Sequence, residues 1–183
     1  MKKYELLVDD TITFFGVQLF RIKALISFSG VEKGEVGGYV ASESNLSQYG
    51  DAWVYGDARV YGNAEVYGNA EVYGDAEVYG DARVYGDAEV YGNAEVCGNA
   101  EVYGDARVYG NADYIVFKNT WSSGRYFTYT KSNKNWRVGC FYGSGAELVE
   151  KAYKDSKKSG DFYKAYVDFV EKLEEIENIH KEQ

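Results

Sequence analysis

The chain has 183 residues, 45% of them hydrophobic, which suffices for one domain with a buried core and an appendage. Its formal net charge is −9, and it has no proline, one histidine and two cysteines. Two cysteines are too few for a disulfide framework, and no segment has the length of a membrane helix. The acidic start does not fit a signal peptide, so we expect a cytoplasmic protein without a membrane partner.

The first expected element is an N-terminal β cap over residues 1–36. Two apolar runs, Thr11-Ile-Thr-Phe-Phe and Val17-Gln-Leu-Phe-Arg-Ile-Lys-Ala-Leu-Ile, are typical of strands joined by a turn near Gly16. They precede a long repeat. The end of a repeat structure exposes backbone groups and apolar side chains, so it requires such a cap.

A hexapeptide, Tyr-Gly-Asp/Asn-Ala-x-Val, recurs eleven times within residues 49–114. Alanine and valine lie two residues apart, on one face of a short strand, and Gly followed by Asp or Asn favours a tight corner. The period predicts a mainly β fold, a left-handed parallel β-helix (hexapeptide solenoid), over residues 37–114. Three hexapeptides form one triangular coil, so each residue stacks on the residue about eighteen positions later. The phase also places Val40 and Leu46 at alanine positions.

The residue between alanine and valine points outward, beginning with Trp53. Stacking brings Arg59 beside Glu77, but it also brings like charges together, so we predict no ordered ladder of ion pairs. Residues 49–113 carry 13 acidic residues against three arginines, a net charge of −10. This acidic solenoid disfavours direct binding of nucleic acid.

Tyrosines beside the corners form columns whose rings stack between coils. They are also candidates for an interface between copies, because tyrosine offers contact area at low entropic cost. One candidate column consists of Tyr55, Tyr73, Tyr91 and Tyr109. Cys97 replaces tyrosine in another column, and nothing near it indicates an activated thiol.

After the repeat, a β-meander of three strands is expected over residues 115–143, followed by helices over residues 144–183. Residues 114–143 carry five cations and no acid. Aromatic rings that stack on a base, together with these cations, could form a pocket in this segment for an anionic ligand such as a nucleotide. The other interpretation is that the tryptophans are core and the cations are solvated. The candidate ligand-binding residues are Trp121, Arg125, Tyr126, Lys131, Lys134, Trp136 and Arg137.

Ser144 and Glu147 have the spacing of a capping box, which predicts a helix to about residue 158 and a second helix from about residue 159. Apolar residues of the second helix recur with heptad spacing, either to pack within the chain or to hold an oligomer together. The heptad residues are Phe162, Tyr166, Phe169, Leu173 and Ile176, of which the first four are candidate interface residues. Tyr163, Val167 and Val170 are expected to widen this stripe.

The repeat resembles the hexapeptide-repeat left-handed β-helix superfamily, which includes trimeric acyltransferases and γ-class carbonic anhydrases. This resemblance implies a homotrimer. Those enzymes use histidine as a base or zinc ligand, whereas the single histidine here, His180, lies in a charged tail. We therefore predict no enzyme activity, catalytic residue, metal or cofactor. The alternative is a trimeric acyltransferase-like enzyme that lacks the usual histidine.

Both flanks, with Gly37-Gly-Tyr-Val at one end and Val138-Gly-Cys-Phe-Tyr-Gly at the other, are similar to uncharacterised phage and prophage hexapeptide-repeat proteins. This resemblance implies a phage protein acting in the host bacterial cytoplasm. We expect a non-catalytic binding protein that inhibits a host defence factor. Its acidic solenoid would bind a host protein, or its C-terminal region would sequester an anionic nucleotide. Rows of carboxylates could also imitate a phosphate backbone, although corner asparagines dilute them.

Overall fold

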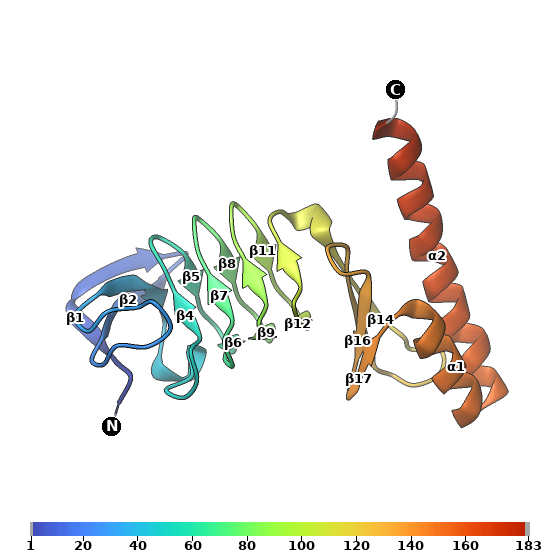
Figure 1. The fold of residues 1–183 in the computed structure, drawn as a ribbon, viewed down its shortest axis with the longest axis horizontal. Helices are drawn as coiled ribbons and strands as arrows, with labels where there is room; N and C mark the ends of the chain where they lie inside the picture. The colour runs from blue at the N-terminus through green and yellow to red at the C-terminus, as the bar shows by residue number, and fades with distance from the viewer. Residues whose placement is uncertain (1, 182–183) are drawn as a thin grey trace. The chain divides into compact units, whose positions relative to one another are not determined.

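The structure is a computed structural model that describes residues 2–181 (Figure 1). The chain forms two compact units. The first comprises the residues up to Val116 together with Thr130–Asn133, and it contains the N-terminal strands and the solenoid. The second comprises Phe117–Tyr129 and the chain from Lys134 onward, and it contains the helices and most of the C-terminal sheet.

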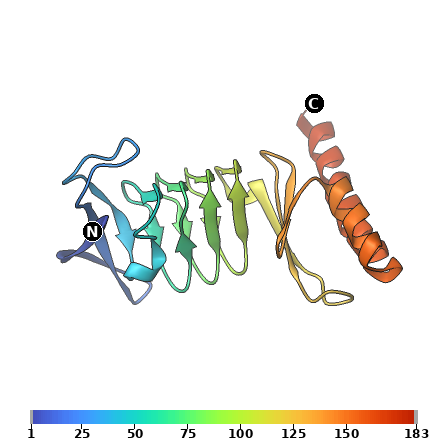
Figure 2. The ribbon, with the colours of Figure 1, turned by 60° about the horizontal axis from the view of Figure 1, so that its bottom comes forward.

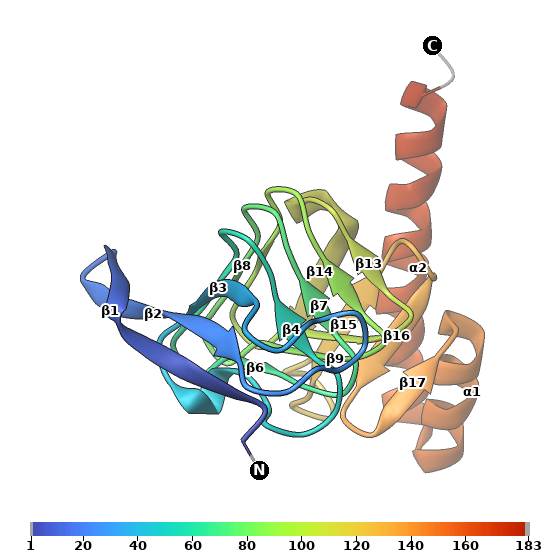
Figure 3. The same ribbon diagram turned by 60° about the vertical axis from the view of Figure 1, so that its left-hand side comes forward.

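The N-terminal cap is an antiparallel hairpin of β1 (Tyr4–Phe14) and β2 (Val17–Ala24), as predicted. The turn between them is Phe15-Gly16, and both residues have positive φ. Strand β2 pairs antiparallel with β3 (Val36–Val40), which in turn pairs parallel with the first full coil. Figure 3 shows this hairpin at the N-terminal end of the solenoid.

The solenoid consists of very short strands that stack into three parallel sheets, and its coils lie side by side in Figure 2. In one sheet, Val54, Val72, Val90 and Val108 pair in succession at intervals of eighteen residues, as the repeat predicts. The strands are β4 (Trp53–Val54), β5 (Arg59–Val60), β6 (Glu65–Val66), β7 (Glu71–Val72), β8 (Glu77–Val78), β9 (Arg83–Gly86), β10 (Glu89–Val90), β11 (Glu95–Val96), β12 (Glu101–Gly104) and β13 (Arg107–Val108).

The core of the solenoid is made of the alanine and valine of the first ten hexapeptides, from Ala52 to Val108, all of which are buried. Burying one valine contributes roughly 1.5–3 kcal/mol. Backbone groups pair between coils, as where the Arg59 N–H donates to the Ala76 carbonyl at 2.9 Å and the Tyr61 N–H to the Val78 carbonyl at 3.0 Å. The short strands therefore gain their stability from the coils on either side.

The first coil differs from the prediction. Val40 pairs with Val60, and Leu46 bridges to Val66, so both are offset by twenty residues instead of eighteen. They occupy valine positions, and the prediction that they occupy alanine positions was wrong. Two additional residues lie between Leu46 and Val54, because this corner is a longer loop. Within it, the Gln48 side chain accepts a hydrogen bond from the Lys3 backbone N–H at 2.8 Å and so attaches the N-terminal segment.

Trp53 occupies the outward position of the repeat and pairs with Glu71 of the next coil. It is fully buried, because the N-terminal cap covers this part of the first coil. The rings of Tyr4 and Phe28 meet it edge-on at 6.1 and 5.4 Å. A methyl group added at Gly37 would lie 2.8 Å from the indole ring. The cap is therefore seated on the one aromatic residue at an outward repeat position.

The C-terminal sheet has four strands, β14 (Tyr114–Lys118), β15 (Tyr126–Thr130), β16 (Asn135–Val138) and β17 (Phe141–Gly143), in that order. The expected meander of three strands thus has a fourth, because β16 and β17 are two separate antiparallel strands. The chain turns at Gly139, whose φ of 58° permits a tight reversal.

Two helices follow, α1 (Gly145–Asp155) and α2 (Lys157–Lys181). The predicted capping box is confirmed: Ser144 Oγ accepts from the Glu147 N–H, and the Glu147 carboxylate accepts from the Ser144 N–H at 2.8 Å. Among residues 2–181, neither helix combines the length and apolar character that spanning a bilayer requires.

Candidate functional site

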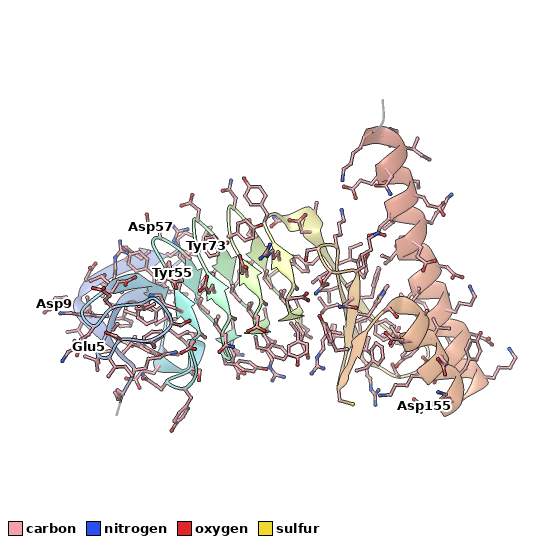
Figure 4. All side chains as sticks on the ribbon, viewed as in Figure 1. Glu5, Asp9, Tyr55, Asp57, Tyr73 and Asp155 are labelled. Carbon is pink, nitrogen blue, oxygen red and sulfur yellow. The ribbon has the colours of Figure 1, made fainter. Side chains whose placement is uncertain are left out.

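The outer surface of the solenoid carries a ladder of tyrosine and glutamate side chains. In five hexapeptides the tyrosine hydroxyl donates to the glutamate sixteen residues later, on the next coil. Two of these rings also stack on the tyrosine of that coil, with centroids 5.1 Å apart for Tyr61 and Tyr79 and 5.0 Å for Tyr73 and Tyr91. Figure 4 labels Tyr55 and Tyr73, which lie on successive coils. The tyrosine–glutamate ladder comprises Tyr55–Glu71, Tyr61–Glu77, Tyr73–Glu89, Tyr79–Glu95 and Tyr85–Glu101.

Burial and the neighbouring carboxylates raise the pKa of Tyr55, Tyr61 and Tyr73. Burial is the largest cause at Tyr55, followed by Glu71, and together they raise its pKa to about 12. The pKa values of Tyr61 and Tyr73 are raised for the same reasons. The hydroxyls are thus protonated and engaged as donors at neutral pH, which suits a structural role. That the Tyr55 column also forms an interface between copies stays a prediction.

The corners carry a second ladder, made of asparagine and aspartate. Asp81 accepts hydrogen bonds from Asn63 at 3.0 Å and from Asn99 at 3.4 Å, on the coils before and after it. Asn69 donates to Asp87 at 2.9 Å. Three of the asparagines that interrupt the acidic rows therefore donate to a corner carboxylate on a neighbouring coil. Stacking by eighteen residues could have revealed both ladders in the sequence.

Charged side chains on the strands form both favourable and unfavourable pairs, as expected. Three arginines lie 3.2–3.6 Å from a glutamate on a neighbouring coil. In contrast, Glu71 lies directly beside Glu89 in the same sheet. Exposed pairs contribute only about 0–1 kcal/mol each. The favourable pairs are Arg59–Glu77, Arg83–Glu65 and Arg107–Glu89.

Lys3 is a buried cation that sequence reasoning missed. Its ammonium donates to the carbonyls of Gly50 and Ala52, at 3.2 and 2.8 Å, and lies 5.1 Å from the Phe28 ring centre. Burial lowers its pKa to about 8. Because only 2% of the residue is exposed, it satisfies carbonyls at the end of the solenoid and does not face a substrate.

Several predicted ligand-binding residues have partners within the protein. Trp136 is buried in the core against Phe127 and Tyr129. The Lys134 ammonium lies 3.5 Å from the Glu174 carboxylate, and Arg137 donates to the Phe141 carbonyl at 3.4 Å. Lys131 belongs to the first unit, where its N–H donates to the Asp113 carbonyl.

The three remaining predicted ligand-binding residues, Trp121, Arg125 and Tyr126, are exposed in the second unit. The Lys118 ammonium lies 5.1 Å from the Tyr126 ring centre. An exposed aromatic and cationic surface of this kind suits an anionic ligand better than the buried residues do.

The predicted interface residues of α2 border the face that packs within the chain, and Tyr166 contacts Phe117 at 5.3 Å. Tyr163, Val167 and Val170 are buried in the second unit. They lie beside the heptad stripe, as predicted, since the rings of Tyr163 and Tyr166 both contact Phe127, at 4.6 and 5.2 Å. Phe169 and Leu173 remain 51% and 38% exposed.

A groove of about 390 Å³ lies beside the N-terminal half of α2, lined almost entirely by apolar atoms. We call it the apolar groove. Aromatic contacts build its wall: Trp121 stacks on Phe162 at 6.5 Å, and Phe117 contacts Phe169 at 6.0 Å. Its lining consists of Phe117, Trp121, Phe162, Ala165, Tyr166 and Phe169.

Within the described part of the chain, no three His, Cys, Asp or Glu side chains are grouped so that they could hold a metal ion. His180 is exposed in the last turn of α2. Cys97 is half-buried with its Sγ 3.9 Å from Tyr114 Oη, and Cys140 is exposed in the β16–β17 turn.

Comparison with known proteins concerns the repeat alone. A family model described as the YdcK beta solenoid repeat matches residues 52–68. No curated protein matches the chain. The matched residues fall within one coil of the solenoid, so the chain is similar to the YdcK-type repeat in this segment, and the similarity concerns the fold.

Proposed function

We propose that this is a non-catalytic binding protein whose acidic solenoid binds a basic surface of a partner protein. The observation that carries the proposal is the net charge of −10 over residues 49–113, placed on the exterior of a regular stack of coils. A surface of one sign attracts a partner of the opposite sign and accelerates their association.

The two ladders support this role because they fix the acidic side chains. A glutamate held by a tyrosine hydroxyl, or an aspartate held by asparagine amides, has little side-chain entropy left to lose. The corner carboxylates of Asp75, Asp81 and Asp87 nevertheless remain exposed. The solenoid thus presents preorganised negative charge to a partner.

The non-catalytic part of the proposal is supported by the chemistry of the solenoid residues. Its tyrosine hydroxyls are donors to glutamate, and the Lys3 amine is covered. The alternative is an acyltransferase-like enzyme without the usual histidine. Turnover of acetyl-CoA above background by the purified protein would establish that alternative.

The finer proposal is a phage or prophage protein that inhibits a host defence factor in the bacterial cytoplasm. The resemblance of both flanks to phage hexapeptide-repeat proteins supports it. The homotrimer that the superfamily resemblance of the repeat implies stays a prediction, and the mass in solution distinguishes it from a dimer. Expression in a bacterium that carries a defence system should raise the plating efficiency of a restricted phage. An unchanged plating efficiency across a panel of defence systems would contradict this finer proposal.

The corner residues offer a matched test of the acidic surface. Asparagine already occupies the corner in five hexapeptides, so changing corner Asp to Asn removes charge while keeping a residue that the corner accepts. The variant carries Asp57→Asn, Asp75→Asn, Asp81→Asn, Asp87→Asn and Asp105→Asn. It should fold as the wild type does but lose the partner that the wild type retains from bacterial lysate.

Capture of the same proteins by both forms would overturn the role of the acidic surface.

A second candidate function is sequestration of a nucleotide by the C-terminal region. With ATP as the probe, binding that Arg125→Glu abolishes and the corner variant retains would favour this second candidate, which rests on the exposure of Trp121, Arg125 and Tyr126.

A further inference from the structure

We infer that two copies of this chain pair through α2 in an antiparallel arrangement. Each copy inserts the C-terminal half of its helix into the apolar groove of the other. This inference concerns the second unit and does not depend on the partner of the acidic solenoid.

The first argument is the apolar stripe along α2. It contains Phe169, Leu173, Ile176 and Ile179, which are 51%, 38%, 43% and 54% exposed. A stripe of exposed aromatic and aliphatic side chains along one helix marks an interaction surface. Within the chain Phe169 contacts Phe117 at one end of the stripe, whereas the buried residues of the same helix are Tyr163, Val167 and Val170.

The second argument is the heptad spacing of this stripe. Phe162, Tyr166, Phe169, Leu173 and Ile176 follow one another at alternating intervals of four and three residues. This spacing is the pattern by which one helix packs along another helix in a coiled coil. The occupant that the pattern favours is therefore a helix with the same pattern.

The third argument is that the two halves of the stripe have complementary shapes. The N-terminal half borders the apolar groove, where Ala165 leaves space between larger side chains. The C-terminal half extends beyond α1 and carries Leu173, Ile176 and Ile179 (Figures 1 and 3). An antiparallel twofold arrangement places each projecting half against the groove of the other copy, which makes the interface self-complementary.

Charge selects the antiparallel direction. Residues 157–168 contain three lysines and two aspartates, whereas residues 169–181 contain four glutamates and two lysines. Parallel helices would align the glutamate-rich halves with each other. Antiparallel helices instead align each half of net charge −2 with a half of net charge +1, and they also oppose the helix dipoles.

The available area is consistent with a stable pair. The exposed parts of Trp121, Phe169, Leu173, Ile176 and Ile179 amount to roughly 500 Å² per copy, before any polar rim is added. Stable interfaces bury about 800 Å² per partner. The stripe and groove thus supply most of the required surface.

The mass in solution tests the pairing. One chain has a mass of 20.6 kDa, and sedimentation equilibrium of the full chain should give twice this value. Phe169→Glu and Ile176→Glu should each give a monomer with unchanged helical circular dichroism, because both side chains are exposed in the single chain. Glu171→Ala, on an exposed position outside the stripe, is the matched control and should remain dimeric.

Cross-linking tests the direction, in a background with Cys97→Ser and Cys140→Ser. Mixed Ala165→Cys and Ile176→Cys proteins should form a disulfide between them. Ile176→Cys alone should not, because two copies of this residue would lie about 16 Å apart in the antiparallel pair. A wild-type monomer or trimer, a dimer that survives Ile176→Glu, or self-cross-linking of Ile176→Cys would each overturn the inference.

Discussion

Replacing Gly74 with alanine should destabilise the solenoid much more than the same change at Gly56. Both glycines follow tyrosine and precede aspartate in the repeat, and both have left-handed backbones, with φ of 74° and 57°. They differ in their surroundings. A Cβ at Gly74 would lie 3.1 Å from the backbone N and O of Gly92, whereas a Cβ at Gly56 would have no atom within 4 Å.

The magnitudes follow from these contacts. The left-handed conformation costs alanine about 1 kcal/mol relative to glycine, and this cost applies at both positions. At Gly74 the new methyl group also presses on a backbone that is fixed by the hydrogen bond from Asp75 N–H to the Gly92 carbonyl. Overpacking of this kind adds about 1–3 kcal/mol. We expect a loss of roughly 1 kcal/mol for Gly56→Ala and 2–4 kcal/mol for Gly74→Ala.

Urea unfolding followed by far-ultraviolet circular dichroism measures both losses in free energy. The comparison isolates the contact between coils, because the backbone strain and the neighbouring residue types are shared. Equal losses at the two positions, or a larger loss at Gly56, would refute the reasoning that the coils are packed too closely for a side chain at the corner.

Three further outcomes are expected. Trp53→Ala should cost about 3–5 kcal/mol in urea unfolding, since it empties the space between Tyr4 and Phe28, and Trp53→Phe should cost less. The pKa of Tyr55 is raised to about 12 in the folded protein, so Tyr55 loses its proton at a lower pH in the unfolded chain. The contribution of Tyr55 to stability is therefore complete below pH 10 and declines as the pH rises toward 12. Tyr55→Phe should therefore reduce the fall of melting temperature in that window. The pKa of Lys3 is lowered to about 8, so its effect on stability has the opposite pH dependence. Between pH 8 and 10.5 the unfolded chain binds more protons than the folded chain, so the free energy of unfolding should rise with pH. Lys3→Met should remove this rise.

The solenoid could be predicted from the sequence because its hexapeptide specifies each coil locally. Alanine and valine determine which side faces inward, and the positive φ of the corner requires glycine. The first coil could not be predicted in the same way. There the phase is set by the longer loop before Val54, and Trp53 is buried by a cap that the repeat does not encode.

The candidate surfaces were predictable in part. Heptad spacing identified the stripe that contains Phe169 and Leu173, but periodicity alone could not tell it from the inward face with Tyr163 and Val167. Adjacent apolar stripes on one helix differ by a single rotation, and only packing against the sheet decides between them. Trp136 and Trp121 illustrate the same limit, since one is core and the other is exposed although their sequence surroundings are similar.

Because each coil pairs with the next in the same way, the length of the solenoid can change only in whole coils without altering the pairing. Loss or gain of three hexapeptides changes the stack by one strand spacing of about 4.8 Å and returns every later residue to its own face. Loss or gain of a single hexapeptide instead turns everything downstream by one third of a coil. It would place Arg83, now beside Glu65, on a different sheet from that glutamate. Gain or loss of hexapeptides in so repetitive a sequence therefore changes which side chains share a sheet. Only a change of three hexapeptides, or a multiple of three, restores the original arrangement.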